Sequence, residues 1–267
     1  MRKKVMTGVI NRKGGVCKTT TTINLAALAA NAGYKALLVD FDPQGSCTGN
    51  LDVAGTLEQR GANIEDYAAS RIILERLNPS MLAVDSGFGF DIIPAGFELM
   101  SLEQYIPSVP NGDTLLSRIM LNDKELNYDF IIFDTPGFMG HIVASVVNVT
   151  GDIIIPNIAT ASSTAGLTDV LAMVREMNEF RAAYPGLGKV NIRGHFFCRA
   201  EPNTQAYRVE NEKMTEMLGG IHLPDHFISK STEIAKSELG KMPLVLMAPS
   251  HRVSTEYKSL FDRLFAE

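Results

Sequence analysis

The feature that most constrains the fold is a glycine-containing loop between an apolar run and a helical pattern near the N-terminus. Val5 to Ile10 is apolar and has the length of a buried strand, and it is followed by the loop Lys13-Gly14-Gly15-Val16-Cys17-Lys18-Thr19-Thr20. Thr19 to Ala32 then has a helical period that stops at Gly33, a residue suited to end a helix. A strand, a tight loop and a helix N-terminus in this order direct backbone N–H groups at one anion. The sequence therefore predicts a phosphate site at this loop.

The loop also supplies the side chains that a nucleotide needs. Lys18 is placed to reach the β- and γ-phosphates as a point charge, and the Thr19 hydroxyl is placed to ligate Mg²⁺. The strict GxxxxGK[ST] pattern nevertheless fails, because Arg12 and Cys17 occupy its two glycine positions. Cys17 brings a Cβ to the position of the second glycine, so the sequence predicts a phosphate loop here without predicting its nucleotide affinity. The predicted nucleotide-binding residues of the loop are Lys13, Gly14, Gly15, Val16, Cys17, Lys18, Thr19 and Thr20.

Two more apolar runs end in acidic residues. Ala36 to Phe41 leads to Asp40 and Asp42, and Phe130 to Phe133 leads to Asp134. The carboxyl ends of parallel strands in an open α/β sheet meet at one edge, where ligands bind. Asp134 is a candidate to hold Mg²⁺ there, through water. For either run alone, a solvated Asp at a strand end is the alternative.

The remaining sequence alternates short apolar runs with stretches of helical period, which is the pattern of βα units on a largely parallel sheet. Because no repeat or linker divides the chain, we expect one α/β domain over residues 1–267. This domain is a P-loop fold with a mostly parallel twisted sheet and helices on both faces. Further strands are predicted at Phe90–Ile93, Ile153–Ile155 and Asn191–Phe197, helices at Thr114–Asn122, Thr164–Ala183, Gln205–Leu218 and Val253–Phe265, and loops at Pro107–Asp113, Pro185–Gly188 and Glu201–Asn203.

Composition limits the classes of partner. The 267 residues carry a formal net charge of −5, so the protein does not wrap nucleic acid with its whole surface and any DNA contact must be local. The three cysteines form no CxxC spacing, as is typical of a reducing cytosol. No apolar run approaches the roughly 20 residues that a membrane span needs, and the basic N-terminus does not lead into a signal peptide. We expect a cytoplasmic protein without a membrane-spanning segment.

The spacing of Lys13 and Lys18 resembles the deviant Walker A box, KGGxxK[ST], of the ParA/MinD group of P-loop ATPases. Asp40-Phe41-Asp42-Pro43-Gln44-Gly45 resembles the Walker A′ segment of this group, and Asp134-Thr135-Pro136-Gly137 resembles its Walker B strand and switch II. The similarity to ParA/Soj-type partition ATPases extends along most of the chain. It implies a slow, Mg²⁺-dependent ATPase that works as a dimeric switch.

The resemblance also assigns roles to single residues. Asp42 positions the attacking water, and Asp40 supports the network of the metal and the phosphate loop. Gly137 donates its N–H to the γ-phosphate, and Lys13 reaches the nucleotide of the other subunit in a face-to-face homodimer. The implied catalytic residues are Lys13, Lys18 and Asp42, and the implied metal-site residues are Thr19, Asp40 and Asp134.

The partners implied by the resemblance are ATP, Mg²⁺, nonspecific duplex DNA and a ParB-like or other centromere-binding adaptor. We expect nucleoid association, and no N-terminal helix-turn-helix domain because the chain lacks a long N-terminal extension. Glu233 stands where the family has an arginine, so the DNA contact is the less specific part of the resemblance. Solvated lysines on a helical face are the alternative. The candidate DNA-binding residues are Lys230, Lys236, Lys241 and Arg252, with Lys258 and Arg263 beside them.

Four other interpretations share parts of this pattern. A MinD-like membrane switch, or an ATPase that positions a protein assembly, has the same core. The stripe Val253, Tyr257, Leu260, Phe261, Leu264 and Phe265 favours packing on the sheet over membrane binding, since two residues follow it. A reductase of the nitrogenase iron-protein type needs cysteines in its switch region, and Asp134 to Gly140 has none. The interpretation as a nonenzymatic scaffold depends only on Arg12 and Cys17, which depart from the strict pattern.

Overall fold

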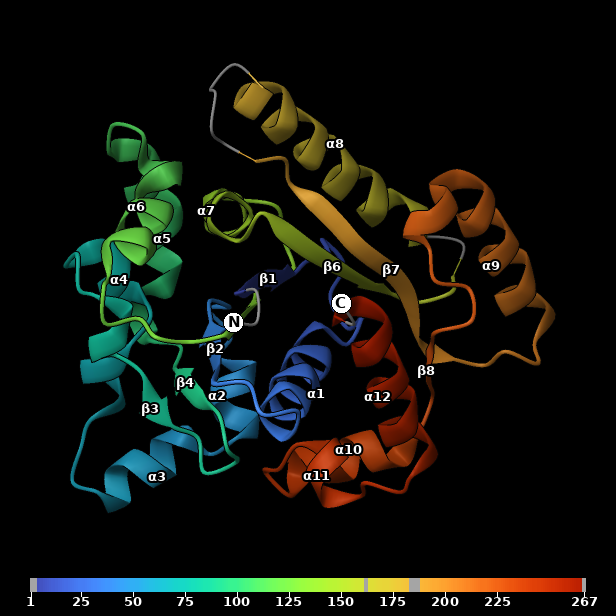
Figure 1. The fold of residues 1–267 in the computed structure, drawn as a ribbon, viewed down its shortest axis with the longest axis horizontal. Helices are drawn as coiled ribbons and strands as arrows, with labels where there is room; N and C mark the ends of the chain where they lie inside the picture. Colours follow the sequence, from blue (N-terminus) through green and yellow to red (C-terminus); the bar gives the residue numbers. More distant parts are fainter. Residues whose placement is uncertain (1–3, 161–162, 183–187, 266–267) are drawn as a thin grey trace.

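The computed structural model describes residues 4–160, 163–182 and 188–265, and these residues form one eight-stranded sheet between two layers of helices (Figure 1). The strand order is β3-β4-β2-β5-β1-β6-β7-β8, and β3–β4 is the antiparallel pair in an otherwise parallel sheet. The predicted mostly parallel α/β fold is therefore confirmed. The strands are β1 Val5–Val9, β2 Ala36–Asp40, β3 Val84–Asp85, β4 Asp91–Ile93, β5 Phe130–Asp134, β6 Asp152–Asn157, β7 Asn191–Ala200 and β8 Ile228–Ser229.

The helices cover both faces because the central strands are apolar on both sides. In β5, Phe130 and Ile132 pack on one face, and Ile131 and Phe133 pack on the other. The first face carries α1 Lys18–Asn31, α2 Ser46–Asn50, α3 Val53–Gln59, α11 Leu244–Met247 and α12 Arg252–Phe265. The second carries α4 Ser70–Leu74, α5 Leu102–Ser108, α6 Leu115–Asn122, α7 His141–Thr150, α8 Ser163–Ala182 and α9 Gln205–Leu218.

The central strands and longer helices begin and end within a few residues of their predicted bounds. Gly33 has φ +81°, as expected for the residue that follows a helix end. The predicted loop at Pro107–Asp113 is wrong at both ends, because Pro107 lies inside α5 and Gly112–Thr114 forms a 3₁₀ turn. Both short strands, β3 and β8, were missed, and so were the helices of 43–108, α7, α10 Thr232–Leu239 and α11. Of the predicted loop at 185–188, residues 185–187 lie outside the described residues, as does Ala183.

The apolar stripe of α12 is part of the core. Val253, Tyr257 and Leu260 have no exposed surface, and the other stripe residues are at most 7% exposed. The helix packs against α1 and the sheet, so the prediction that this stripe is structural is confirmed. None of the helices in the described part of the chain combines the length and apolar content that a bilayer span requires.

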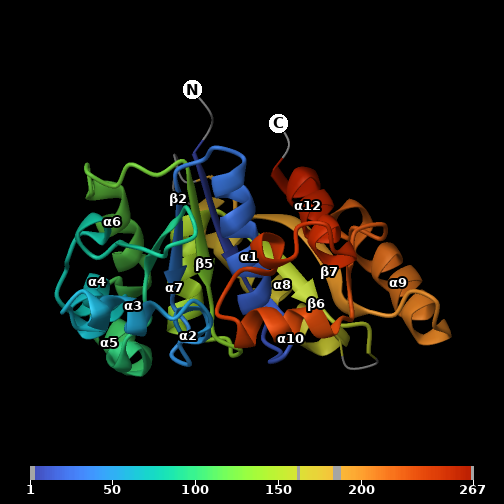
Figure 2. The ribbon, with the colours of Figure 1, turned by 90° about the horizontal axis from the view of Figure 1, so that it is seen from below.

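Two helices from distant parts of the sequence lie at the same end of the sheet. Figure 2 shows α2 and α10 together at this end. Residues of both helices line one cavity with the start of α1. The topology thus brings the loop after β1, the segment after β2 and the segment after β8 to one place, as expected for the carboxyl edge of a parallel sheet.

Candidate nucleotide site

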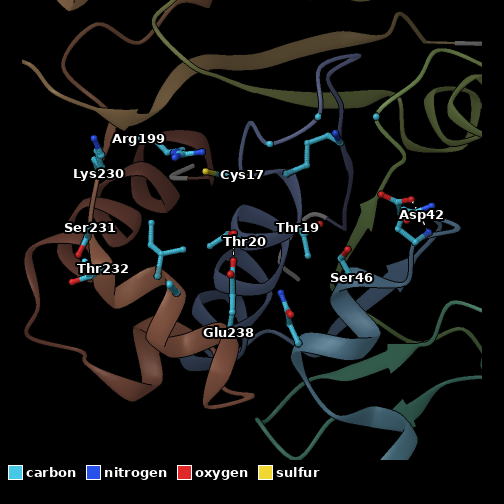
Figure 3. Close-up of a pocket in the computed structure, with 18 residues that line it drawn as sticks. Cys17, Thr19, Thr20, Asp42, Ser46, Arg199, Lys230, Ser231, Thr232 and Glu238 are labelled. Atoms are coloured by element: carbon cyan, nitrogen blue, oxygen red, sulfur yellow. Dashed lines mark hydrogen bonds between the residues drawn. The ribbon is translucent and has the colours of Figure 1, made fainter.

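A cavity of about 980 Å³ opens at the carboxyl edge of the sheet (Figure 3). The loop between β1 and α1 forms its floor, with Gly15 at φ +72° and Cys17 at φ +62°. Val16, also predicted to bind the nucleotide, is fully buried and does not line the cavity. The wall is made by Gly14, Gly15, Cys17, Lys18, Thr19, Thr20, Asp42, Gln44, Ser46, Asn50, Gly137, Arg199, Lys230, Ser231, Thr232, Ile234, Ala235 and Glu238.

Lys18 places a buried ammonium at the wall of this cavity. Its Nζ donates a hydrogen bond to the Lys13 carbonyl oxygen at 3.3 Å, so the side chain folds back over its own loop. Burial lowers the pKa of Lys18, and the carboxylates of Asp134 and Asp42 act in the opposite direction. A phosphate oxygen in the cavity is a stronger acceptor than a neutral carbonyl, because the hydrogen bond is then charge-assisted on both sides.

The turn after β5 lies against the same loop. A Cβ built on Gly137 would lie 3.5 Å from Lys18 Nζ and 3.5 Å from the Cα of Gly14, which is ordinary van der Waals contact. At the start of the turn, the Thr135 hydroxyl donates to the Val9 carbonyl oxygen at 2.7 Å. Gly137, predicted to serve the γ-phosphate, is therefore at the cavity and next to the predicted phosphate lysine.

Two of the predicted metal-site residues, Thr19 and Asp134, are in direct contact. The Thr19 hydroxyl donates to Asp134 Oδ2 at 2.7 Å, and the Thr22 hydroxyl donates to Oδ1 at 3.2 Å. Burial raises the pKa of Asp134 to about 6. A fully buried carboxylate of this kind is stabilised as an anion by a nearby cation, so the hydroxyl and carboxylate oxygens fit a hard divalent ion such as Mg²⁺.

Asp40 is the neighbour of Asp134 on the adjacent strand but lies behind the cavity wall. Its Oδ2 accepts hydrogen bonds from the Thr48 N–H at 2.8 Å and the Thr48 hydroxyl at 2.7 Å, and its Oδ1 accepts one from the Asp42 N–H at 3.3 Å. Burial, and then the charge of Asp134, raises the pKa of Asp40 to about 7. These contacts join the end of β2 to α2 and to the segment that carries Asp42, so Asp40 supports the site without lining the cavity.

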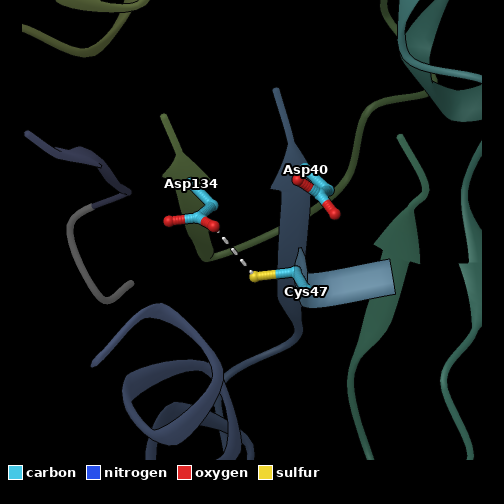
Figure 4. Close-up of side chains that lie close together, drawn as sticks. All are labelled: Asp40, Cys47 and Asp134. Carbon is cyan, nitrogen blue, oxygen red and sulfur yellow. Dashed lines mark hydrogen bonds between the residues drawn. The ribbon is translucent and has the colours of Figure 1, made fainter. Parts of the chain in front are cut away.

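Cys47 completes this buried cluster and was not expected from the sequence (Figure 4). Its Sγ lies 3.4 Å from Asp134 Oδ2, and the ligand atoms of Asp40, Cys47 and Asp134 all lie within 4.8 Å of one another. Burial raises the pKa of the Cys47 thiol, which keeps it protonated as a hydrogen-bond donor. The position of Cys47 directly after the acidic segment was the available signal.

Asp42 lies on the cavity wall, unlike Asp40. Its Oδ1 accepts a hydrogen bond from the Gln44 N–H at 3.0 Å, and its carbonyl oxygen accepts one from the Gly45 N–H at 2.8 Å. These two bonds fix the turn after β2 and leave the carboxylate next to the cavity. The predicted water-positioning residue thus lines the same cavity as Lys18 and Thr19.

Lys13 extends away from the cavity of its own chain. Its Nζ donates to the Thr160 hydroxyl at 3.0 Å, and its backbone N–H donates to Asn11 Oδ1 at 2.9 Å. The neighbouring Arg12 pairs with Asp169 on α8. Arg12 is therefore directed toward α8 and Lys13 toward the loop after β6, and a role of Lys13 in a second subunit stays a prediction.

The four candidate DNA-binding residues each have an intramolecular partner. Surface pairs of this kind contribute little and are screened by salt. Lys230 also lines the cavity. The partners are Glu201 for Lys230 at 3.3 Å, Glu233 for Lys236 at 2.5 Å, the Gly49 carbonyl oxygen for Lys241 at 2.7 Å and Glu256 for Arg252 at 3.6 Å.

The side of the cavity formed by β7 and α10 was not predicted. It is formed by Arg199 at the end of β7 and by the segment from Lys230 to Glu238, and Glu238 accepts a hydrogen bond from the Thr20 hydroxyl at 3.3 Å. These residues come together only through the order of the sheet, and no local motif marks them.

Cys17 adopts a left-handed backbone and turns its thiol toward β7. It hydrogen-bonds the thiol of Cys198 and lies next to Arg199 (Figure 3). The hydrogen bond with Cys198 lowers the pKa of Cys17, and the guanidinium of Arg199 acts in the same direction, against burial. Burial instead raises the pKa of both Cys47 and Cys198. Cys17 is also partly exposed, whereas Cys47 and Cys198 are buried, so we expect Cys17 to react first of the three thiols.

We predict that a maleimide adds to Cys17 first and blocks nucleotide binding, because the adduct fills the wall of the cavity. Intact-mass measurement should show one adduct, and saturating ATP should slow its formation. The Cys17→Ser variant is the control and should resist both modification and inactivation. Equal labelling with and without ATP would contradict the placement of Cys17 at the nucleotide.

The comparisons with known proteins agree with this geometry. A family model described as an AAA domain matches residues 4–183. The chain is 30% identical over 211 residues to the chromosome-partitioning ATPase Soj of Treponema pallidum (strain Nichols), with 79% of this chain and 77% of that protein covered. The residues matched by the family model include the loop after β1, the segment after β2 and Gly137.

Two solved structures have the same fold. A plasmid partition protein of Borrelia burgdorferi B31 bound to AMPPNP superposes with a TM-score of 0.80 at 21% identity, covering 98% of each chain. Cobyrinic acid a,c-diamide synthase of Mycobacterium smegmatis with bound ADP and magnesium gives a TM-score of 0.76 at 20% identity, covering 97% of this chain and 93% of the other. The structures show the shared fold, and the family match and the relative show that the chain belongs to the AAA domain family and is a ParA/Soj-type ATPase.

Proposed function

We propose that this protein binds ATP with Mg²⁺, hydrolyses it slowly and acts as a dimeric switch in DNA partition. The observation that carries the proposal is the arrangement of Lys18 and Thr19 on the wall of one cavity, with the buried carboxylate of Asp134 directly behind Thr19 and hydrogen-bonded to its hydroxyl. Related proteins supply the partition role, as in the chromosome-partitioning ATPase Soj. The proposed place of action is the cytoplasm, at the nucleoid.

In the proposed mechanism, the triphosphate lies over the amides of residues 14–19 and Lys18 leaves the Lys13 carbonyl for the β- and γ-phosphates. Thr19 and Asp134 would hold Mg²⁺, which neutralises the phosphate charge that develops on transfer. Asp42 orients a water for in-line attack on the γ-phosphorus. The bond from the γ-phosphorus to the bridging oxygen breaks, and ADP and phosphate leave.

Phosphate release from ATP by the purified protein, with and without random duplex DNA, tests this function. We expect slow Mg²⁺-dependent turnover, together with DNA binding that requires ATP and falls steeply with salt, because such contacts are made with phosphates. An adaptor of the ParB-like class should raise the turnover. No ATP hydrolysis under any of these conditions would leave a nonenzymatic scaffold.

An ATPase that positions a protein assembly is the second candidate. It is favoured by the intramolecular partners of Lys230, Lys236, Lys241 and Arg252, which reduce the free positive charge available to DNA phosphates. Turnover without any DNA binding at low salt would select this candidate. The apolar stripe of α12 is buried, so it does not favour a membrane-binding function.

The Lys13→Ala variant is expected to bind ATP normally and to lose about 100-fold or more in turnover, as when a trans cation is removed from a phosphoryl-transfer site. The reason is that Lys13 points away from its own cavity, toward Thr160, and so is available to a facing subunit after rearrangement. Arg12→Ala is the matched control and should keep most of the turnover. Wild-type hydrolysis in Lys13→Ala would show that no trans lysine is needed.

A further inference from the structure

The turn that carries Gly137 ends at α7, and a side chain from α5 holds the start of this helix. Glu103 Oε2 accepts a hydrogen bond from the His141 N–H, and Oε1 accepts one from the Ile142 N–H, both at 2.9 Å. These N–H groups have no acceptor within their own helix, since they belong to its first turn. A carboxylate at a helix N-terminus is also stabilised by the helix dipole. Glu103 thus bonds α5 to the end of the turn through two charge-assisted bonds.

Gly140 shows how closely this carboxylate approaches the turn. Its φ of −146° and ψ of −169° are extended values that any residue adopts. A Cβ at this position, however, would overlap Oε2 of Glu103 and lie 2.7 Å from Oε1. A larger residue at this position would therefore displace the Glu103 carboxylate, although the backbone conformation itself would accept it.

A second carboxylate binds the ring of the same helix start. Asp113 Oδ1 lies 2.9 Å from His141 Nδ1, and Asn148 Nδ2 donates to the Asp113 carbonyl oxygen at 3.1 Å. This pair is solvent-exposed, with side chains 41% and 44% exposed. The contact of Glu103 differs from it because it is made with the backbone, so it fixes the path of the chain and not only one side chain.

The turn is thus fixed at both ends, with its active part between them. Thr135 bonds to the last residue of β1, and Glu103 bonds to the residues after Gly140. Gly137 lies between these anchors, in contact with the loop of Gly14 and Lys18. A shift of the α7 end of the turn changes where the N–H of Gly137 points.

We propose that Glu103 is a positioning residue that sets this turn so that the Gly137 N–H meets the γ-phosphate of ATP. The inference rests on the proposed ATPase function. Glu103 acts through the backbone of the turn and touches no substrate. It therefore governs how the protein distinguishes ATP from ADP, since ADP has no γ-phosphate and needs only the loop after β1.

The test compares Glu103→Ala, Glu103→Gln, Gly140→Ala and the double variant Glu103→Ala/Gly140→Ala. For each, the affinities for a nonhydrolysable ATP analogue and for ADP, kcat, KM and the unfolding midpoint are measured. Glu125→Gln, at an exposed residue between α6 and β5, is the charge-matched control. Glu103→Gln keeps one acceptor and tests the role of the charge should the alanine variant fold poorly.

We expect Glu103→Ala to keep ADP affinity within about twofold and to lose at least about tenfold in both ATP-analogue affinity and kcat, because the γ-phosphate donor is misplaced. Gly140→Ala should show the same losses, since its Cβ displaces the carboxylate. The double variant should be no worse than Glu103→Ala, because the obstacle to the Cβ is gone. Glu103→Gln should lie between the wild type and Glu103→Ala.

Three results would overturn the proposal: a wild-type preference for ATP over ADP in Glu103→Ala, additive losses in the double variant, or a parallel loss of ADP and ATP affinity with a lower unfolding midpoint. The last result would mark Glu103 as a structural contact alone. A wild-type protein that binds the ATP analogue but never hydrolyses it would instead count against the proposed function, and the affinity ratios of the variants would still decide the role of Glu103.

Discussion

The Lys18→Ala variant should lose ATP binding almost completely, by about 3 kcal/mol or more, which is over 100-fold in affinity. Lys18 is 7% exposed, and its ammonium lies at the cavity wall. Without it, the β- and γ-phosphates would face the carboxylates of Asp42 and Asp134 with one cation fewer between them. Titration of a fluorescent ATP analogue in the presence of Mg²⁺ measures the loss.

The fold of this variant should be at least as stable as that of the wild type. Burial lowers the pKa of Lys18, which means that the folded protein bears the cost of desolvating this charge in the absence of an anion. Lys124→Ala removes an exposed lysine and is the control, with unchanged ATP affinity expected. A normal nucleotide affinity in Lys18→Ala would contradict the assignment of the phosphate loop.

The strand, loop and helix at the N-terminus could be predicted because their signals are local. The apolar run of β1, the glycines of the loop and the helical period of α1 follow one another directly in the sequence. The buried strands β2 and β5 are equally visible, since both are apolar throughout and end in acids. The sequence could for this reason predict that Lys18, Thr19 and Asp134 lie close together.

The rest of the site depends on tertiary structure. Cys17 meets Cys198, and Thr20 meets Glu238, through the order of strands β1, β6, β7 and β8. Short helices such as α2 and α5 have too few residues to show a period, and packing decides their conformation. The hydrogen bonds of the Glu103 carboxylate to the start of α7 join two segments that no sequence motif connects. Sequence reasoning also placed Asp40 and Asp42 alike at the sheet edge, whereas the turn after β2 puts Asp42 alone of the two on the cavity wall.

Removal of the Asp42 carboxylate should separate ATP binding from hydrolysis. In Asp42→Ala we expect turnover to fall by about 100-fold or more, the usual effect of removing a group that orients or activates the nucleophile. ATP binding should persist, because the loop after β1 and Lys18 are untouched. The nearby Asp42 charge adds to the effect of burial in raising the pKa of Asp134, so its loss favours the ionised form of that carboxylate and hence the metal.

With ATP bound and not consumed, the Asp42→Ala protein should accumulate as a dimer. Phosphate release, nucleotide retention and light scattering on the same sample measure the three expectations. Asp42→Asn keeps an acceptor for the Gln44 N–H, so it should preserve the turn and still lose turnover, which assigns the effect to the charge. Asp262→Ala, at an exposed residue of α12, is the control with wild-type turnover. Unchanged hydrolysis in both Asp42 variants would remove this residue from the mechanism and leave the attacking water to be oriented by another group of the cavity.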